Sequence, residues 1–355
     1  MAGKQVKQKN AGMTQLQSEL KEETFHRVYL FFGEERYLVL KMRDNLVRAA
    51  VSPDDTMNLN IHKTAWPDVS KIMDECLAMP FFADRRVVLV QDSGYFAAGK
   101  GKEEAEKLIG LLGELPETTI LLFVETEVDK RSRLYKAVSK AGLSVEFEHP
   151  DEMELARWVV SQLSENRIRI TKGALQMLLE RTGADMTMLR AQLDKLAACA
   201  GEGGTLSETD VGGLVAERLE TRVFELVDAV GHRDRRGAIS RYDELLRMQE
   251  EPNRILYFLG RQFNLLYLMK VLSQKGKGTV EMMKVMDLRY SFQIRKLSDQ
   301  ARFFTTEQLR HAVADCTAME QRFKTGKIDV RLGVELLLVK YSRPGEPVRG
   351  GAGAS

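Results

Sequence analysis

The sequence has little cysteine and histidine, and neither residue type forms a pattern that binds metal or closes disulfides. Its three cysteines, Cys76, Cys199 and Cys316, are far apart in the chain and include no CxxC pair. This spacing predicts three small buried side chains in a reducing compartment. The five histidines are also isolated, without HxxxH or HExxH spacing. We therefore expect no metal, no cofactor and no catalytic residue of these types.

Long apolar runs are missing as well. No stretch approaches the ~20 apolar residues that a membrane-spanning helix requires, and the basic opening MAGKQVKQKN lacks the apolar segment of a secretory signal. We expect a cytoplasmic protein without a membrane partner. The chain also has no large excess of positive or negative charge, because 53 Lys and Arg residues and 51 Asp and Glu residues leave a net charge of +2. This balance neither requires nor excludes nucleic acid.

The residues that are present have the balance of a globular protein. Of 355 residues, 44% are hydrophobic and 29% charged, and this length predicts two or three domains. In the first part, apolar runs alternate with stretches of helical period. Strands are predicted at 28–32, 86–92, 118–126 and 145–150. Alternation of this kind predicts a parallel sheet with crossover helices.

After Pro150 we find no further strand pattern, and the chain is helical by period up to Tyr341. Gly183 is a predicted helix C-cap, and Ser207 begins the capping sequence S-E-T-D. The closing stretch SRPGEPVRGGAGAS has too few apolar residues to form a folded core. We predict a lead (1–24), an α/β domain (25–150), a small helical domain (151–217), a larger helical domain (218–341) and a flexible tail (342–355).

The motif GYFAAGKG has part of the skeleton of a phosphate-binding loop. Gly94 is followed after four residues by Gly99 and Lys100, but Gly101 stands where Ser or Thr would hold magnesium. The bulky side chains of the YFAA segment also do not suit the tight loop in which backbone amides surround a phosphate. The third predicted strand ends in Glu125 without a second carboxylate. We therefore favour a surface loop, in a nucleotide-binding fold without a working site.

The segment LAMPFFADRR, residues 77–86, places Phe81 and Phe82 at a corner between a helix and a strand. Pro80 ends the helix. Turn residues are usually polar, so an adjacent aromatic pair requires an explanation. Both rings could fold inward over the core, which composition alone favours, or they could form an exposed wedge for a pocket on a partner. Aromatic anchors of the second kind contribute roughly 2 kcal/mol or more each.

Basic residues gather in the larger helical domain, where they could contact DNA phosphates or acidic surfaces of a partner. Charged helix positions are more often simply solvated. The candidate contacts are Arg233, Arg235, Arg236, Lys324 and Lys327.

Six segments resemble the delta subunits of the bacterial DNA polymerase III clamp loader. They are VYLFFGEERYLV (28–39), LAMPFFADRRVVLV (77–90), DKRSRLYKAV (129–138), GADMTMLRAQLDKLAACAG (183–201), VFELVDAV (223–230) and LGRQFNLLYLMK (259–270). No single motif is highly specific, but all six occur in the order of that family. The resemblance extends over residues 25–341.

The resemblance implies an α/β domain of the P-loop ATPase type, without a working nucleotide site, followed by two all-α domains, a lid and a collar. It also implies a non-catalytic subunit that binds and opens the sliding clamp, so that the clamp is loaded on primed DNA. By position, the clamp-binding pair is Phe81 and Phe82, flanked by Leu77 and Met79. The resemblance therefore favours the exposed wedge. Loader ATPase subunits and the other loader subunits are the further implied partners.

Two other classes of function stay open. An active ATPase of the same superfamily, such as a helicase loader, would bind nucleotide near Gly99 and Lys100. A DNA-binding structural protein would use the basic helical domain and bind DNA tightly, with strong salt dependence.

Overall fold

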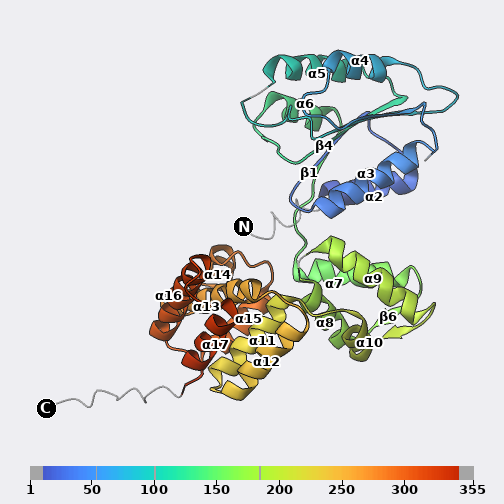
Figure 1. Ribbon diagram of the computed structural model, residues 1–355. Helices are drawn as coiled ribbons and strands as arrows, with labels where there is room; N and C mark the ends of the chain where they lie inside the picture. Colours follow the sequence, from blue (N-terminus) through green and yellow to red (C-terminus); the bar gives the residue numbers. More distant parts are fainter. Residues whose placement is uncertain (1–10, 53, 100, 184, 344–355) are drawn as a thin grey trace. The chain divides into compact units, whose positions relative to one another are not determined.

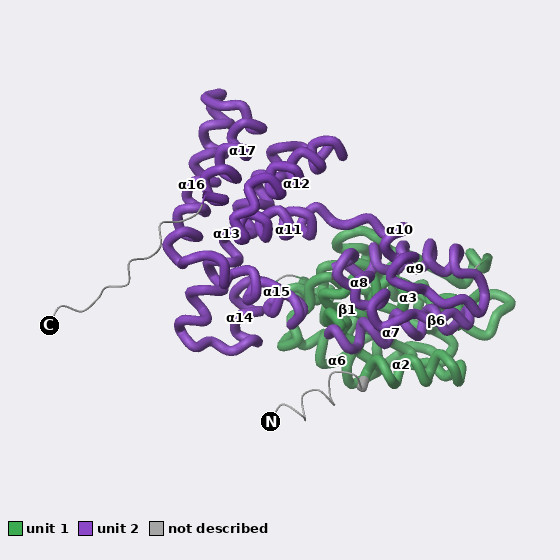
Figure 2. Tube along the Cα trace, turned by 90° about the horizontal axis from the view of Figure 1, so that it is seen from below, with its two compact units in different colours: residues 1–150 green, residues 151–355 purple. Residues whose placement is uncertain are grey.

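The computed structural model describes residues 11–52, 54–99, 101–183 and 185–343. The chain divides into two compact units between Pro150 and Asp151 (Figure 2). Unit 1 combines strands and helices, and unit 2 is almost entirely helical. The expected fold class, a parallel α/β domain followed by helical structure, is confirmed.

Unit 1 is built on a five-stranded sheet in the order β2-β3-β4-β1-β5. Its strands are β1 (Val28–Phe32), β2 (Leu59–His62), β3 (Arg86–Gln91), β4 (Thr119–Glu125) and β5 (Leu143–Glu146). Every neighbouring pair is parallel. The central strands β1 and β4 are buried along their whole length, which explains their continuous apolar sequences.

Helices cover both faces of this sheet (Figure 1). On one face lie α4 (Val69–Leu77), α5 (Lys102–Glu114) and α6 (Arg133–Ala141), and on the other lie α2 (Ala11–Glu22) and α3 (Arg36–Ala50). Side chains alternate along β1, so Leu30 packs in the first layer and Phe31 in the second. Leu16 of α2 is fully buried in the second layer. This helix of the predicted lead is therefore part of the fold of unit 1.

Two strands of the sheet differ from the sequence prediction. β2 is missing from the predicted set, because it is an edge strand of partly buried residues without a clear apolar pattern. β5 begins two residues before the predicted strand at 145–150 and ends at Glu146. The next residue, Phe147, still donates its N–H to the carbonyl oxygen of Phe32 (2.7 Å), and its own carbonyl oxygen accepts the N–H of Glu35 (2.9 Å). The chain then leaves the sheet.

The first part of unit 2 contains α7 (Glu152–Ser164), α8 (Lys172–Thr182), α9 (Met186–Ala200) and α10 (Glu208–Leu214). Gly183 ends α8, and Ser207 begins α10 with a capping box, as predicted. The expectation of no strand after Pro150 is wrong, because β6 (Arg169–Ile170) and β7 (Thr205–Leu206) form a short parallel pair. Strands of two residues are too short for their periodicity to be recognised.

The second part of unit 2 is organised around α13 (Pro252–Gln274), which packs against four other helices, α11, α15, α16 and α17. Its other helices are α11 (Leu219–Gly231), α12 (Arg235–Arg247), α14 (Thr279–Val285), α15 (Ser291–Ala301), α16 (Thr306–Lys324) and α17 (Val330–Tyr341). Leu259, Phe263 and Leu266 of α13 are buried in a single hydrophobic core of residues 219–341. The division of unit 2 at residue 217 stays a prediction.

The cysteines differ in exposure. Cys76 in α4 and Cys316 in α16 are buried as expected, whereas Cys199 near the end of α9 is exposed. Burial raises the pKa of both buried thiols to about 12. These two thiols therefore stay protonated near neutral pH and behave as small apolar side chains.

A candidate protein-binding site between α4 and β3

The loop between α4 and β3 carries an exposed apolar cluster. Phe82 is 96% exposed, Met79 75%, Phe81 53% and Leu77, at the end of α4, 41%. The alternative in which both phenylalanines fold into the core is therefore wrong. The structure brings these four predicted residues together on one short segment. We call residues 77–82 the apolar loop. Exposed clusters of large apolar side chains are typical of protein-binding sites.

The backbone of the apolar loop holds its outermost ring in an unusual conformation. Phe82 has a φ of +48°, in the left-handed region that bulky residues rarely occupy. Its ring packs edge-to-face on the ring of Phe81, with 4.7 Å between centroids. Such a conformation persists only where neighbouring structure holds it. The arrangement presents Phe82 outward while Phe81 supports it.

Asn58, directly before β2, holds the apolar loop from the side of the sheet. It is fully buried, and its Oδ1 accepts the N–H of Phe81 (2.6 Å) while its Nδ2 donates to the carbonyl oxygen of Phe81 (2.9 Å). Nδ2 also donates to Asp55 Oδ2 (2.7 Å). The hydrogen bond from the Asn58 side chain is the main cause that lowers the pKa of Asp55. The sequence pattern singled out neither residue.

The C-terminal end of α4 is anchored by side chains of the sheet. Thr119 Oγ1 donates to the carbonyl oxygen of Cys76 (2.8 Å), and Arg86 donates to that of Glu75 (3.1 Å). The imidazole of His62 also contacts the Glu75 carboxylate (2.6 Å). The contacts of Thr119 and Arg86 satisfy backbone carbonyl groups that the helix end leaves without intrahelical partners. The apolar loop therefore begins from a fixed helix end.

The turn after β1 is the position at which a nucleotide-binding α/β fold usually holds phosphate, at the N-terminus of the next helix. Here Glu35 is the N-cap of α3, is buried, and accepts the N–H of Tyr37 (3.3 Å). His149 Nδ1 contacts the same carboxylate (2.8 Å). A carboxylate thus occupies the electropositive helix end, and the neighbouring Glu34 adds a second negative charge. This end of α3 is poorly suited to phosphate.

The loop with the sequence GYFAAGKG precedes α5 and is covered by an indole ring. A Cβ atom on Gly101 would lie 2.5 Å from Cζ3 of Trp66, and one on Gly94 would lie 3.1 Å from its Cζ2. Tyr95 is buried and packs edge-to-face on Trp66. Lys100 lies outside the described residues. Gly94 and Gly101 therefore accommodate an aromatic side chain of the same chain, whereas an added Cβ atom on Gly99 would meet open space.

Glu125, the carboxylate at the end of β4, also has a structural contact. It is buried and accepts the backbone N–H of Ser93 (3.1 Å) and the Ser93 hydroxyl (2.5 Å). Burial raises its pKa to about 7. In this position Glu125 fixes the turn that follows β3.

Two of the five basic candidates in unit 2 have partners within the unit. Arg233 is partly buried and donates to the carbonyl oxygen of Tyr341 (2.8 Å), so it holds the end of α17. Lys324 pairs with Glu320 one turn earlier in α16 (2.6 Å). Exposed pairs of this kind contribute little stability and leave the charges accessible.

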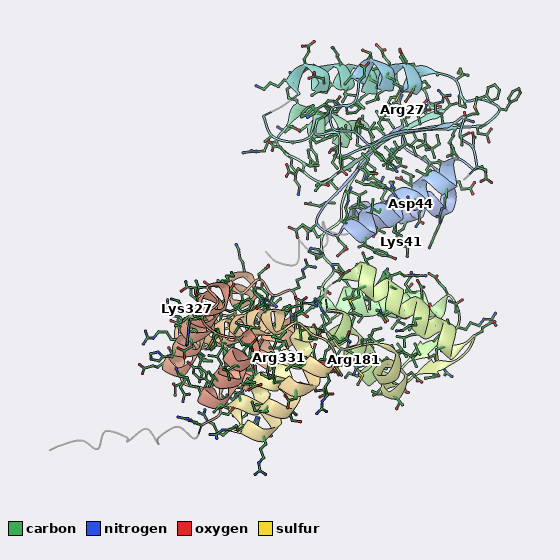
Figure 3. All side chains as sticks on the ribbon, in the orientation of Figure 1. Arg27, Lys41, Asp44, Arg181, Lys327 and Arg331 are labelled. Carbon is green, nitrogen blue, oxygen red and sulfur yellow. The ribbon has the colours of Figure 1, made fainter. Side chains whose placement is uncertain are left out.

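The other three basic candidates are exposed. Arg235 and Arg236 lie with Arg247 along a shallow groove of α12. Lys327 follows α16, near the start of α17 that carries Arg331 (Figure 3). The candidates are therefore distributed over separate elements, with one local basic groove on α12.

Within the described ranges, no three His, Cys, Asp or Glu side chains are grouped so that they could hold a metal ion. The same part of the chain contains no helix with the length and apolar character to cross a membrane.

Comparison with known proteins assigns two large parts of the chain to one family. The family model described as DNA polymerase III, delta subunit matches residues 29–148, and the model for the C-terminal domain of the same family matches residues 220–341. Together they account for more than half of the chain.

Individual relatives agree with these matches. DNA polymerase III subunit delta of Bacillus subtilis is 27% identical over 335 residues, 92% of this chain and 96% of the relative. The subunit delta of Escherichia coli is 23% identical over 319 residues, 87% of this chain and 89% of the relative. The solved structure of the Bacillus subtilis DNA clamp loader delta protein has a TM-score of 0.70 at 24% identity, covering 93% of this chain and 99% of that one. That similarity shows a shared fold.

Proposed function

The chain belongs to the DNA polymerase III delta subunit family, and from this premise we propose that it is the clamp-loader subunit that binds and opens the sliding clamp. The family expected from the six sequence segments is thereby confirmed. In the proposed role, the chain acts as an adaptor. It binds the clamp, assembles with the loader ATPase subunits and the other loader subunits, and works on primed DNA within that assembly.

The apolar loop is the observation that carries the proposal. Phe82 and Met79 are among the most exposed large apolar side chains of the described residues. Exposure of this kind is unfavourable in water, because apolar surface is stabilised by burial. A pocket on the clamp that buries the two rings would gain roughly 2 kcal/mol or more from each. Leu77, at the base, would lie at the rim of that contact.

Opening of the clamp follows if the apolar loop binds the open form better than the closed form. A ligand shifts a conformational equilibrium only by its difference in affinity for the two states. Changing a 1:99 population to 99:1 requires about 5.5 kcal/mol of such difference. Two aromatic anchors supply a large part of this amount when their pocket is complete only in the open form. The remaining free energy would come from the wider contact around the rings.

We assign no catalysis to the chain. Glu35 caps the helix that would receive phosphate, and Trp66 covers the glycine loop. Both observations support a subunit without nucleotide hydrolysis. The energy of ATP would then enter through the loader ATPase subunits, which would expose or cover the apolar loop.

The test is a double substitution, Phe81→Ala with Phe82→Ala, measured by surface plasmon resonance on immobilised sliding clamp of the same organism. We expect a loss of at least 100-fold in clamp affinity, about 3 kcal/mol, because both anchors are removed. Circular dichroism and thermal unfolding should be unchanged, since both side chains are largely exposed.

Phe303→Ala is the matched control. Phe303 is also a partly exposed phenylalanine, 39% exposed in unit 2, and packs on His232. This variant should bind the clamp as the unchanged chain does. Undiminished clamp affinity in the double variant would contradict the proposed function.

A further inference from the structure

We propose that Asn58 is a positioning residue for clamp binding, which holds the apolar loop in its binding conformation before the clamp arrives. This inference rests on the proposed function, because it assigns a new residue to the same site. Asn58 itself is fully buried. It would act only through the backbone of Phe81, without touching the clamp.

The side chain of Asn58 makes the two hydrogen bonds to Phe81 that the backbone of a neighbouring strand would otherwise make. A carboxamide presents one acceptor and one donor side by side, as a peptide group does. Oδ1 accepts the N–H of Phe81 at 2.6 Å, and Nδ2 donates to its carbonyl oxygen at 2.9 Å. One buried side chain therefore satisfies both backbone groups of Phe81. It fixes the chain directly before the left-handed residue Phe82.

Asp55 fixes the orientation of that amide. Its Oδ2 accepts a hydrogen bond from Asn58 Nδ2 (2.7 Å), and its Oδ1 accepts the backbone N–H groups of Met57 (3.1 Å) and Asn58 (3.0 Å). A flipped amide would turn its oxygen toward this carboxylate and its NH2 group toward the N–H of Phe81. Both contacts would be repulsive, so only the observed orientation fits. We call Asp55 and Asn58 the brace.

The brace affects affinity because an unordered loop must be ordered when it binds. Fixing the backbone of a residue opposes binding, and so does immobilising each large side chain. A loop that is already held in place avoids this cost. The left-handed φ of Phe82 increases the cost of ordering the loop, since a free chain would rarely adopt this conformation. Removing the brace should therefore weaken clamp binding by about 10-fold to 100-fold without removing a single clamp contact.

The experiment uses the full chain with the substitution Asn58→Ala. Clamp affinity is measured by surface plasmon resonance, and hydrogen exchange is followed at the backbone amide of Phe81. We expect the loss of affinity given above, together with loss of protection at Phe81. A fold that is merely destabilised would instead exchange faster throughout unit 1.

Asn60→Ala is the matched control. Asn60 lies in β2, two residues after Asn58, and its Oδ1 has no hydrogen-bond partner among the described residues. The control should keep both affinity and protection.

Asp55→Ala provides a second variant in case Asn58→Ala folds poorly. Asp55 lies in a surface turn, and its substitution leaves the Asn58 side chain in place, so we expect a smaller loss of affinity, about 3-fold to 10-fold.

A double-mutant comparison tests whether Asn58 acts through the same contact as Phe82. In a Phe82→Ala background, Asn58→Ala should cost much less affinity than in the unchanged chain, because the two residues act on the same contact. Equal losses in both backgrounds would overturn the positioning role.

The two proposals fail in different ways. If Asn58→Ala keeps clamp affinity while Phe81→Ala with Phe82→Ala loses it, only the role of Asn58 is wrong. If both variants keep affinity, the proposed function is wrong, and the role of Asn58 is wrong with it.

Discussion

At the end of β1, Gly33 meets a backbone requirement that other residue types do not. Its φ is +131°, and a Cβ atom at this position would lie 2.4 Å from the carbonyl oxygen of Phe147. The chain passes here between β1 and the N-cap Glu35 of α3. Glycine is needed both for the conformation and for the close approach.

We predict that Gly33→Ala lowers the free energy of unfolding by about 2–4 kcal/mol, because it adds backbone strain and a steric conflict with a strand neighbour. Thermal unfolding followed by circular dichroism measures the change. Gly110→Ala is the control, since Gly110 lies in α5, where an added Cβ atom would meet open space. That substitution should stabilise the protein by about 0.5–1 kcal/mol. An unchanged melting temperature for Gly33→Ala would contradict the conformational argument.

Single residues were predictable where their chemistry is unusual for their place. Two adjacent phenylalanines at a helix-to-strand corner are conspicuous in the sequence, but composition alone favoured their burial, and only the resemblance to the delta subunits predicted the exposure that Phe81 and Phe82 have. Asn58 has no such signal, because an asparagine before a short edge strand is ordinary. Its contact with Phe81 exists only because β2 pairs with β3 and brings distant residues together. Local sequence does not contain that pairing.

At the scale of elements, the helix start of α3 and the glycine loop before α5 both argue against nucleotide binding. The first holds the Glu35 carboxylate, and the second is covered by Trp66. We predict that isothermal titration of the purified chain with magnesium ATP shows no saturable binding at micromolar concentrations, because a carboxylate caps the helix end where phosphate would bind and an indole ring packs on the glycine loop.

The control for this titration is a loader ATPase subunit measured under the same conditions. Saturable binding that disappears in a Lys100→Ala variant would contradict the prediction. It would support the active ATPase that the sequence leaves open.

Strands were predictable in proportion to their burial. β1, β3 and β4 form the middle of the sheet, and their apolar runs reveal them. The edge strand β2 and the pair β6–β7 could not be predicted, since strands that are partly exposed or only two residues long show no recognisable apolar periodicity. Helix ends were found where capping chemistry is strong, as at Gly183 and Ser207.

For the whole molecule, the distribution of basic residues is the relevant property for DNA, and the candidate residues lie on separate elements with one local basic groove on α12. DNA affinity grows with the number of phosphates that basic side chains contact together, so a single local groove supports only weak binding at physiological salt. We predict that the isolated chain binds primed DNA with a dissociation constant of about 10 μM or weaker at 150 mM salt. Fluorescence anisotropy with a labelled primer–template measures it.

Arg235→Glu with Arg236→Glu is the informative variant, because these residues lie in the basic groove of α12. The substitution should reduce the residual binding further. Nanomolar, steeply salt-dependent binding by the unchanged chain would contradict the prediction, and it would favour the DNA-binding structural protein.

The unequal exposure of the cysteines has a practical consequence. Because Cys76 and Cys316 are buried and only Cys199 is accessible, a maleimide dye should attach at a single site without any engineered substitution. That site lies on α9, in unit 2, whereas the apolar loop belongs to unit 1. A chain tagged in this way would report on complex formation by its fluorescence while every residue of the proposed contact keeps its native identity.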